Sequence, residues 1–398
     1  MKLGILYSHF TELGGAENAI INQLKLLRGE GHNVKCYFTY VDKELIDKFQ
    51  NPRDIDAYIN FPFIKNELIN LFLSIPIAPF RANLFKELDV LICHGYGPAV
   101  WMGFISKRMN GTKYLSYIHS PPRFLYLDET QKELWQFDAL RRFIYKIGRI
   151  SGFVLKDIDY LSVINSDAVL ANSSFTAKRL RRIYGVKPMV CYPPVNTDVF
   201  KPLNDKTVEE LRNSFGKPLI LSTGRIVAIK RWEWLIEALG YLKKEYPTVT
   251  LLITGRISGK NENYVKKLLY IAKRIGVEKN VKFLNFRPLD ELVKLYNAAD
   301  VYVYAVPRED FGLGPVEAMA CGTPAVVWND GGGPCETVLE GKTGFKAHPY
   351  SIEDFADKVL KSLELDKSAM REFAYEYVKD RFSSEKHIEC LRKVLEKL

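Results

Sequence analysis

Residues 301–324 read VYVYAVPREDFGLGPVEAMACGTP, and this stretch decides the fold of the second half of the chain. The apolar run Val301–Ala305 predicts a buried strand, and a glycine-containing loop follows it. Pro315, placed near a first helical position, predicts a helix that begins directly behind the loop. A strand, a glycine loop and a helix in this order are typical of a doubly wound α/β domain, where ligands bind beyond the carboxyl ends of the strands.

Two glutamates mark this stretch as a candidate binding site. Glu309 lies in the expected loop and Glu317 in the expected first helical turn, where a helix amino terminus can hold a phosphate. Glu309 can then bond sugar hydroxyls and Glu317 a ribose. An acid in a first turn can also serve only the helix dipole. That alternative accounts for Glu317, but it leaves Glu309 and the glycine loop unexplained.

The same alternation of short apolar runs and helix-length amphipathic runs covers the rest of the chain and predicts parallel sheets with crossover helices. The expected strands of the first half are Leu3–Tyr7, Asn33–Tyr40, Val90–His94, Tyr114–His119, Ala168–Asn172 and Val190–Val195. Those of the second half are Leu219–Gly224, Thr250–Gly255, Val281–Asn285, Val301–Ala305 and Ala325–Trp328. Helical runs such as Trp232–Tyr246 and Tyr264–Ile275 separate most of them.

A linker near residue 200 divides the two series of strands. Pro193 and Pro194 begin a polar, turn-rich stretch that extends to about Asp205. We therefore expect one domain over residues 1–200 and a second over residues 201–384. The last helix, residues 385–398, stands apart from the second series and can pack back on the first domain. A length of 398 residues suits two domains.

Composition narrows the compartment and the partner. The formal net charge of +10 indicates an anionic partner such as a nucleotide, a lipid phosphate or an anionic membrane. None of the six cysteines has zinc-site or redox spacing, so reduced thiols in a cytosolic protein are expected. No secretory signal is visible. The apolar stretch of residues 61–80 contains charges and three prolines, so it does not qualify as a spanning helix.

Three further motifs follow expected strands. Gly14-Gly15-Ala16-Glu17 opens a helix and suits a phosphate, although an ordinary glycine turn would look the same. His119, fixed by two prolines that follow Ser120, can bond a sugar hydroxyl or act as a structural histidine. Arg225 and Lys230, just beyond Gly224, can neutralise a leaving diphosphate without a metal, or form a solvated basic turn.

Downstream segments complete the pattern. Residues 331–337, GGGPCET, are interpreted as a flexible turn that lines the same ligand-binding cleft as Glu309. Residues 341–345, GKTGF, are interpreted as a hairpin-like turn. Asp-Ile-Asp triplets at 54–56 and 157–159 do not follow a strand and glycine turn. We interpret them as surface or helix residues, and no metal site is expected.

Taken in order from Gly14 to about Phe345, these motifs resemble glycosyltransferase family 4, of retaining mechanism and GT-B fold. The resemblance implies two Rossmann-like, doubly wound domains that face each other across a cleft. It implies that Gly15 contacts the donor phosphates, that Arg225 and Lys230 bind the diphosphate and that His119 lies near the transferred sugar. The resemblance also implies that Glu309 holds the donor sugar and Glu317 the ribose. Phe311, Gly312 and Leu313 complete the expected donor-binding set, with His119 and Glu309 as the catalytic candidates.

Within the family, the segments around Glu309, Lys230 and His119 resemble mannosyltransferases that build lipid-linked glycans. The resemblance implies GDP-mannose as donor, with no metal or other cofactor, and a UDP-sugar as the alternative. The chain departs from this pattern where Leu127 occupies the slot of an expected aspartate and Asp128 follows. A glycogen or starch synthase is disfavoured because the donor loop follows the mannosyl type.

Two other classes of protein are weighed against a transferase. An NAD-dependent oxidoreductase would show Gly-x-Gly-x-x-Gly after the first strand, and none occurs there. A nucleic-acid-binding protein would show aromatics among clustered basic residues in a compact module. The basic run on the helix after Ser173 suits a phosphate-bearing lipid equally well, so no nucleic-acid partner is expected.

The first half mixes basic and apolar residues in a manner typical of interfacial proteins. We therefore expect a cytosolic enzyme that docks on an anionic membrane through its N-terminal domain and meets a lipid-phosphate-linked or glycan acceptor. The residues expected on the acceptor or membrane side are Arg123, Arg141, Arg142, Ser173, Lys178 and Arg182.

Overall fold

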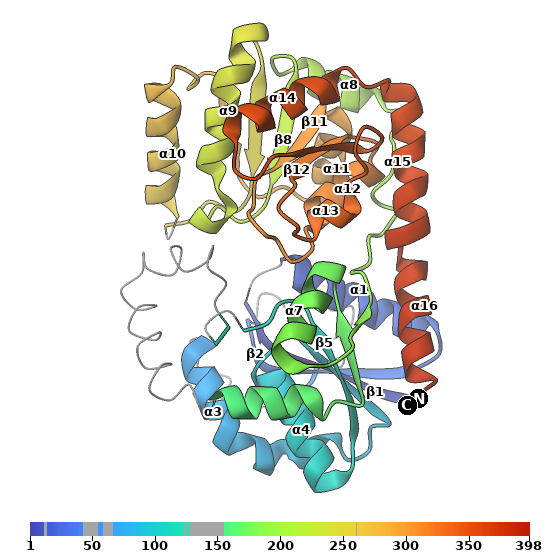
Figure 1. The fold of residues 1–398 in the computed structure, drawn as a ribbon. Coiled ribbons are helices and arrows are strands. Elements are labelled where there is room, and N and C mark those ends of the chain that lie inside the picture. Colours follow the sequence, from blue (N-terminus) through green and yellow to red (C-terminus); the bar gives the residue numbers. More distant parts are fainter. Residues whose placement is uncertain (12–13, 43–54, 59–66, 123–124, 127–154, 260) are drawn as a thin grey trace. The chain divides into compact units, whose positions relative to one another are not determined.

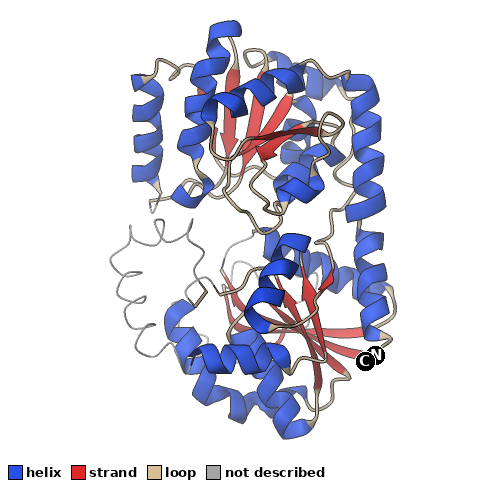
Figure 2. Cartoon of the chain, in the orientation of Figure 1, coloured by secondary structure: helices blue, strands red, loops and turns tan. Residues whose placement is uncertain are grey.

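A computed structural model describes residues 1–11, 14–42, 55–58, 67–122, 125–126, 155–259 and 261–398. Within these residues the chain forms two units. The first comprises Met1–Pro194 together with Ser384–Leu398, and the second comprises Val195–Ser383. Each unit is built on one parallel sheet with helices on both of its faces (Figures 1 and 2).

The first unit has a seven-stranded sheet with the order β3-β2-β1-β4-β5-β6-β7. Its strands are β1 (Lys2–Phe10), β2 (Asn33–Val41), β3 (Ile55–Tyr58), β4 (Val90–His94), β5 (Lys113–Ile118), β6 (Ala168–Ala171) and β7 (Met189–Val190). Its helices are α1 (Gly15–Gly29), α3 (Glu67–Arg81), η2 (Ala82–Phe85), α4 (Pro98–Asn110), α7 (Ser174–Tyr184) and α16 (Ser384–Leu395), with a further helix over residues 155–164.

The second unit has a six-stranded sheet with the order β10-β9-β8-β11-β12-β13. Its strands are β8 (Leu219–Thr223), β9 (Thr250–Thr254), β10 (Val281–Leu284), β11 (Val301–Tyr304), β12 (Ala325–Trp328) and β13 (Gly344–Ala347). Its helices are α8 (Lys206–Asn213), η3 (Ala228–Lys230), α9 (Trp232–Glu245), α10 (Glu262–Arg274), α11 (Leu289–Ala298), α12 (Leu313–Ala320), α13 (Pro334–Thr337), α14 (Ile352–Leu363) and α15 (Lys367–Phe382).

The central strands of both sheets are buried on both faces because helices cover each face, so they read as continuous apolar runs. Strand β9 (TLLIT) and strand β11 (VYVY) are buried along their whole length. In the second unit Trp328 at the end of β12 packs against Phe355 of α14, with ring centroids 4.5 Å apart. Full burial of one such side chain stabilises the fold by about 2–3 kcal/mol.

Helix α16 is part of the first unit although it ends the chain. Its apolar side chains Ile388, Leu391 and Val394 lie in the same buried cluster as the residues of β1 and β4. On its outer side Arg392 pairs with Glu30, which follows α1, at 2.6 Å. The apolar spacing of three residues puts these side chains on one helical face, and that face covers the sheet.

Three edge strands differ from the sequence expectation, and one of them is β7, which covers Met189–Val190 where a strand over Val190–Val195 was expected. Residues 341–343 of the stretch expected as a hairpin-like turn do form a turn, but Gly344 and Phe345 begin β13, which pairs parallel to β12 and so does not make a hairpin. Gly344 permits this pairing, because a Cβ there would lie 1.9 Å from the Ala325 carbonyl oxygen. Strand β3 was not expected either, and Asp56 of the first Asp-Ile-Asp triplet belongs to it. At four residues each, β3 and β13 are too short to show a clear periodicity.

Three smaller differences from the sequence expectation concern helices. Helix α12 begins at Leu313, so Glu317 lies in its second turn and not in its first. The helix over residues 155–164 contains the second Asp-Ile-Asp triplet, as expected, but Asp159 is buried and accepts a hydrogen bond from Tyr184 at 2.6 Å. The stretch expected as a turn at residues 331–337 ends in the short helix α13.

Candidate active site

The order of strands places the candidate site of the second unit. The sheet changes direction between β8 and β11, because the chain runs outward to β10 from one of them and to β13 from the other. Loops that leave the carboxyl ends of two such strands diverge and leave room for a ligand. Gly224 and Arg225 follow β8 directly, and the loop that holds Glu309 follows β11. Arg225 and the loop that holds Glu309 therefore lie at the point of the second sheet where doubly wound folds bind ligands.

Lys230, Tyr304 and Glu309 form a closed triad in this loop region. The Lys230 ammonium donates to Glu309 Oε2 and to the Tyr304 hydroxyl, at 2.8 Å each. The Tyr304 hydroxyl in turn donates to Glu309 Oε2 at 2.7 Å. Lys230 and Glu309 keep only 18% and 17% of their side chains exposed. Burial, followed by the negative charge of Glu309, raises the pKa of Tyr304 well above its usual value, so this phenol stays a donor.

The triad leaves part of its hydrogen-bonding capacity open. A lysine ammonium has three N–H donors, and two of them are used here. Arg225 lies exposed at the start of the same region, and its positive charge acts on Tyr304. Two cations next to an oriented carboxylate suit a ligand with both phosphate and hydroxyl groups.

Close backbone packing fixes the position of Glu309. The amide of Gly333 donates to the Glu309 carbonyl at 2.7 Å. A Cβ on Gly333 would lie 2.4 Å from the Asp310 carbonyl oxygen, so only glycine allows this contact. Asp330 accepts from the amides of Arg308 at 2.5 Å and Gly332 at 2.9 Å, and it thereby ties the two loops together. The glycines at 332 and 333 thus shape the donor loop.

A buried relay of hydroxyl groups orients Glu317. Tyr296 donates to Glu317 Oε2 at 2.7 Å, and the Thr223 hydroxyl lies 3.0 Å from the hydroxyls of both Tyr296 and Tyr302. Burial raises the pKa of Glu317, and the Tyr296 hydrogen bond opposes part of that rise. Gly314 lets the relay reach α12, since a Cβ there would lie 2.2 Å from the Tyr302 hydroxyl.

The remaining predicted donor residues have structural positions next to this network. Phe311 is buried and packs against Phe382 of α15 with ring centroids 6.0 Å apart. Gly312 precedes α12 with a φ of 82°, a conformation that favours glycine. Leu313 is the first residue of α12 and is half-buried.

Gly15 begins α1 at the carboxyl end of β1 in the first unit, and it is exposed there. Glu17 turns back to accept the Gly14 amide at 3.1 Å and the Tyr7 hydroxyl at 2.8 Å. The start of α1 is therefore held in place, and a helix amino terminus can present backbone N–H groups to an anion.

Three histidines of the first unit gather around Tyr117. His119 Nε2 lies 3.0 Å from Nδ1 of His94, and the two rings are stacked. His387 of α16 stacks on Tyr117 and pairs through Nδ1 with the Tyr192 carbonyl at 2.7 Å. Burial lowers the pKa of His94 well below its usual value. Burial, helped by His387, lowers that of His119 to about 4, and burial lowers that of His387 to about 4.

The residues predicted for the acceptor side are only partly described. The Ser173 side chain is buried and caps α7 by accepting the Thr176 amide at 3.0 Å. Lys178 and Arg182 are exposed on α7. Arg123, Arg141 and Arg142 lie outside the described residues, as do Leu127 and Asp128. No helix in the described part of the chain is both long and apolar enough to cross a membrane.

Sequence reasoning missed several residues of this region. Tyr296, Tyr304 and Asp330 orient the two glutamates or the loop between them, and His94 contacts His119. His94 carried a usable signal, because it ends a predicted strand and precedes a glycine. Tyr302 and Tyr304 alternate along a strand and so share one face, but nothing local indicates what that face contacts.

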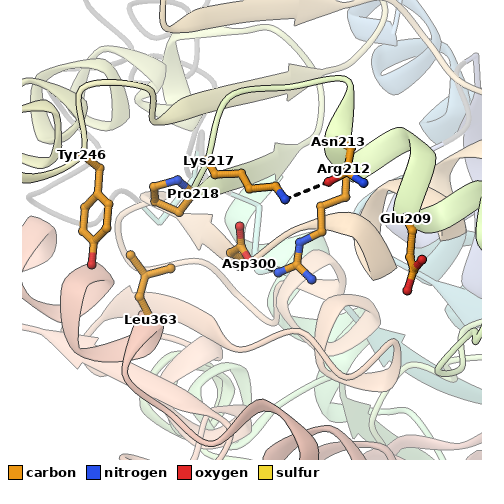
Figure 3. Close-up of a pocket in the computed structure, with 8 residues that line it drawn as sticks. All are labelled: Glu209, Arg212, Asn213, Lys217, Pro218, Tyr246, Asp300 and Leu363. Carbon is orange, nitrogen blue, oxygen red and sulfur yellow. Dashed lines mark hydrogen bonds and ion pairs between the residues drawn. The ribbon is translucent and has the colours of Figure 1, made fainter.

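A hollow of about 550 Å³ lies in the second unit, at the ends of the strands opposite to those that bear the triad (Figure 3). Its lining includes Pro218 and Asp300, which precede β8 and β11, so it lies at the amino-terminal ends of these strands. Arg212 pairs with Asp300 inside it, and Lys217 bonds Asn213 at 2.7 Å. These polar groups are engaged within the hollow, and we assign no function to it.

The described residues contain no group of three or more histidine, cysteine, aspartate or glutamate side chains suited to a metal ion.

Comparisons with known proteins identify both halves of the chain. Residues 13–199 match the family model described as Glycosyltransferase Family 4, and residues 204–381 match that of Glycosyl transferases group 1. The D-inositol 3-phosphate glycosyltransferase of Corynebacterium aurimucosum is 34% identical over 213 residues, 51% of this chain and 50% of the relative. The Corynebacterium jeikeium protein of the same name is 33% identical over 250 residues, 59% and 58% of the two chains. The chain thus spans about half the length of the curated relatives it matches.

Solved structures match the chain over its whole length. Anabaena Alr3699/HepE in complex with UDP gives a TM-score of 0.77 at 21% identity, with 100% of both chains covered. Sucrose-phosphate synthase from Thermosynechococcus elongatus gives 0.77 at 19% identity, covering 100% of this chain and 98% of the other. These matches confirm the fold that the sequence predicted.

Proposed function

Since the chain belongs to glycosyltransferase family 4 and has the GT-B fold, we propose that it transfers a hexose from a sugar nucleotide to an acceptor hydroxyl with retention of configuration. The observation that carries this proposal is the Lys230–Tyr304–Glu309 triad beyond the carboxyl ends of β8 and β11. It combines a cation for phosphate with a fixed carboxylate for sugar hydroxyls, next to the amino terminus of α12.

In the proposed reaction the bond between the sugar C1 and the diphosphate oxygen breaks, and the acceptor oxygen bonds to C1 on the same face. The acceptor proton passes to the departing diphosphate. Lys230 and Arg225 stabilise the charge that develops on that leaving group, which is where most of the rate enhancement would arise. Glu309 holds sugar hydroxyls, Glu317 the ribose, and the backbone of Gly15 a donor phosphate.

His119 is proposed to contact the transferred sugar. Its imidazole is neutral near pH 7, because burial lowers its pKa to about 4. A neutral imidazole can accept or donate a hydrogen bond to a sugar oxygen without adding charge.

Two donors are distinguished by specific observations. The segment around Lys230, which contributed to the GDP-mannose prediction, includes Arg231 as the next residue. Arg231 is engaged locally: its guanidinium lies 4.9 Å from the Trp234 ring centroid and 3.5 Å from Glu233. A relative of the same fold has been solved with UDP, with UDP and glucose, and with UDP-glucose. We therefore place a UDP-hexose first among the donors and GDP-mannose second.

The acceptor is proposed to carry a phosphate. The curated relatives are named D-inositol 3-phosphate glycosyltransferases, and this name contains a phosphate-bearing compound. In this chain, Lys178, Arg181 and Arg182 are exposed on α7, and the formal net charge is +10. A phosphate on a soluble sugar and a phosphate on a lipid would both be attracted by such a surface.

Thermal unfolding with nucleotides tests the donor site. UDP, GDP, ADP and their hexose conjugates are each added in EDTA, and a ligand at 100 times its Kd stabilises the native state by about 2.7 kcal/mol. We expect UDP or GDP, and their sugar conjugates, to raise the midpoint of thermal unfolding. We also expect transfer of radiolabelled hexose to continue in EDTA. If no nucleotide shifts the midpoint, the proposed function fails. If transfer stops in EDTA and magnesium or manganese restores it, the metal-free reaction fails while the transferase assignment stands.

Membrane docking through the first unit, at the cytoplasmic face, is a further part of the proposal. We expect the protein to float with phosphatidylglycerol vesicles at low salt and to dissociate at high salt, because each basic residue at such a surface contributes about 1 kcal/mol. Replacing Arg141, Arg142, Lys178 and Arg182 with glutamate should abolish flotation. The control makes the same charge change on α10 of the second unit, at Lys266, Lys267, Lys273 and Arg274. Equal flotation of both variants would refute docking through the first unit.

A further inference from the structure

We infer that His94 is a positioning residue that fixes the tautomer of His119, so that His119 carries its proton on Nδ1 and presents an N–H donor there. His94 ends β4 and His119 follows β5, and the two strands are neighbours in the sheet. Strands β1 and β4 flank the point where this sheet changes direction, so His94 stands where doubly wound sheets bind ligands.

The contact between the two rings requires one shared proton. His94 Nδ1 and His119 Nε2 are 3.0 Å apart, which is hydrogen-bond distance. Burial lowers the pKa of each ring, and a positive charge on one ring would repel a second positive charge on the other. Both rings are therefore neutral near pH 7. Each neutral ring has one N–H and one lone pair, and only one of the facing nitrogens can donate.

The surroundings of His94 decide which nitrogen donates. His94 is wholly buried, and its Nε2 atom has no hydrogen-bond partner among the described residues. If His119 donated, the proton of His94 would sit on Nε2 as a buried N–H without an acceptor. Orphaned buried N–H groups are rarer in proteins than buried acceptors that lack a donor. His94 therefore carries its proton on Nδ1 and donates to His119 Nε2.

The tautomer of His119 follows from this assignment. Because its Nε2 accepts from His94, its one proton is on Nδ1. His119 is half-buried, in contrast to the enclosed His94, so part of the residue remains exposed. The identity of the group that accepts the Nδ1–H hydrogen bond rests on the proposed function, in which this N–H donates to an oxygen of the transferred sugar. The tautomer itself does not depend on that proposal.

The tautomer can be read directly from the unmodified protein. The full chain is labelled with ¹⁵N-histidine, and long-range ¹H–¹⁵N spectra at pH 7.5 distinguish a protonated ring nitrogen from an unprotonated one. The chain has six histidines, and the set of signals that disappears in His119→Gln belongs to His119. We expect Nδ1 of His119 to be protonated and Nε2 to be the acceptor. A protonated Nε2 on His119 overturns the inference.

Two amide substitutions separate positioning from simple packing. Asparagine and glutamine carry the same amide group at different distances from the backbone. His94→Asn places a side-chain N–H near the position of Nδ1, whereas His94→Gln places it near the position of Nε2. We expect His94→Asn to keep the Nδ1–H signature of His119 and at least one third of the transfer rate. His94→Gln should mix the tautomers and lower kcat/KM at least tenfold. Matching spectra and rates for the two folded variants would exclude a positioning role.

The outcomes also separate this inference from the proposed function. A wild-type protein with the Nδ1–H tautomer but no transfer from any sugar nucleotide would refute the transferase and leave the His94 assignment intact. Active wild type with the opposite tautomer would do the reverse. Should either amide variant fail to fold, as judged by far-UV circular dichroism, the wild-type spectrum still decides the tautomer.

Discussion

Oxygen Oε2 of Glu309 accepts from both Lys230 and Tyr304, and its other oxygen accepts the Asp310 amide at 3.2 Å. Three donors thus hold one carboxylate in a single orientation before any ligand arrives. Such preorganisation avoids reorganisation during the reaction and gives oriented groups their large effect on rate. The residue is therefore more informative as a test of function than as a test of stability.

Glu309→Gln is expected to lower hexose transfer by about 100- to 1000-fold, the range found when one oriented polar group is removed from an active site. The fold should persist, with a loss of about 1–3 kcal/mol from the weakened hydrogen bonds to a charged group. Initial rates at saturating donor, together with urea unfolding, measure both effects. Glu291→Gln is the control, because that exposed carboxylate pairs with Arg287 on the surface at 3.3 Å. Equal rates for Glu309→Gln and wild type would count against a catalytic role.

Tyr296→Phe is expected to weaken nucleotide binding about tenfold, equivalent to ~1.4 kcal/mol, because Glu317 loses the hydrogen bond that orients it. Calorimetric titration with UDP and GDP measures this affinity. Tyr302→Phe is the matched control: its hydroxyl contacts Thr223 and is one step further along the relay. The control should therefore change the Kd by less than about threefold. Should both variants bind as wild type does, the relay has no influence on the nucleotide.

At the scale of elements, the donor loop after β11 depends on its contact with the segment before α13. Gly333 allows the two backbones to touch, and Asp330 bonds two amides, one on each side. The non-glycine residue Arg308 has a φ of 44°, which places it in the left-handed region. Backbone in that region persists only where surrounding contacts hold it, and the hydrogen bond from the Arg308 amide to Asp330 is one such contact.

Gly333→Ala is expected to destabilise the second unit by about 2–3 kcal/mol and to lower transfer, since the new Cβ would push against backbone atoms 2.4 and 2.5 Å away. Denaturant unfolding and initial rates measure the two effects. Gly259→Ala is the control, because a Cβ there meets nothing within 4 Å and its backbone φ is not in the left-handed region. That variant should keep a free energy of unfolding within about 0.5 kcal/mol of wild type and should leave the transfer rate unchanged. A stable and fully active Gly333→Ala protein would contradict the contact.

At the scale of the whole molecule, buried titratable groups make the first unit sensitive to acid. His119 and His387 titrate at about 4 in the folded protein and near 6.5 when unfolded, because burial disfavours their charged forms. The stability that these neutral rings confer is present above pH 6.5 and is lost as pH falls toward 4. Asp159 acts in the opposite sense: burial raises its pKa to about 6, so the fold gains from its protonation over the same range.

The free energy of unfolding of the first unit is therefore expected to fall between pH 7 and pH 4.5. Burial lowers the pKa of His94 as well as those of His119 and His387, and these three histidines together outweigh Asp159. His387 alone accounts for about 3 kcal/mol over its full range, at ~1.4 kcal/mol per pKa unit. Urea unfolding at both pH values measures the loss. His387→Gln should make it smaller, and Asp159→Asn should make it larger because the opposing group is gone. A pH dependence that neither substitution alters would assign the acid sensitivity to other groups.

Local sequence patterns predicted the two doubly wound domains, most of their strands, the loop that bears Glu309 and the short segments that bear Lys230 and Glu317. These features depend on apolar periodicity and on glycine and proline, which act within a few residues of each other. Only the tertiary structure decided which groups meet. Lys230 and Glu309 are 79 residues apart, His94 and His119 are 25 apart, and Cys191 and His387, in contact within the first unit, are 196 apart. Such pairings follow from strand order and register across a sheet, which no local pattern encodes.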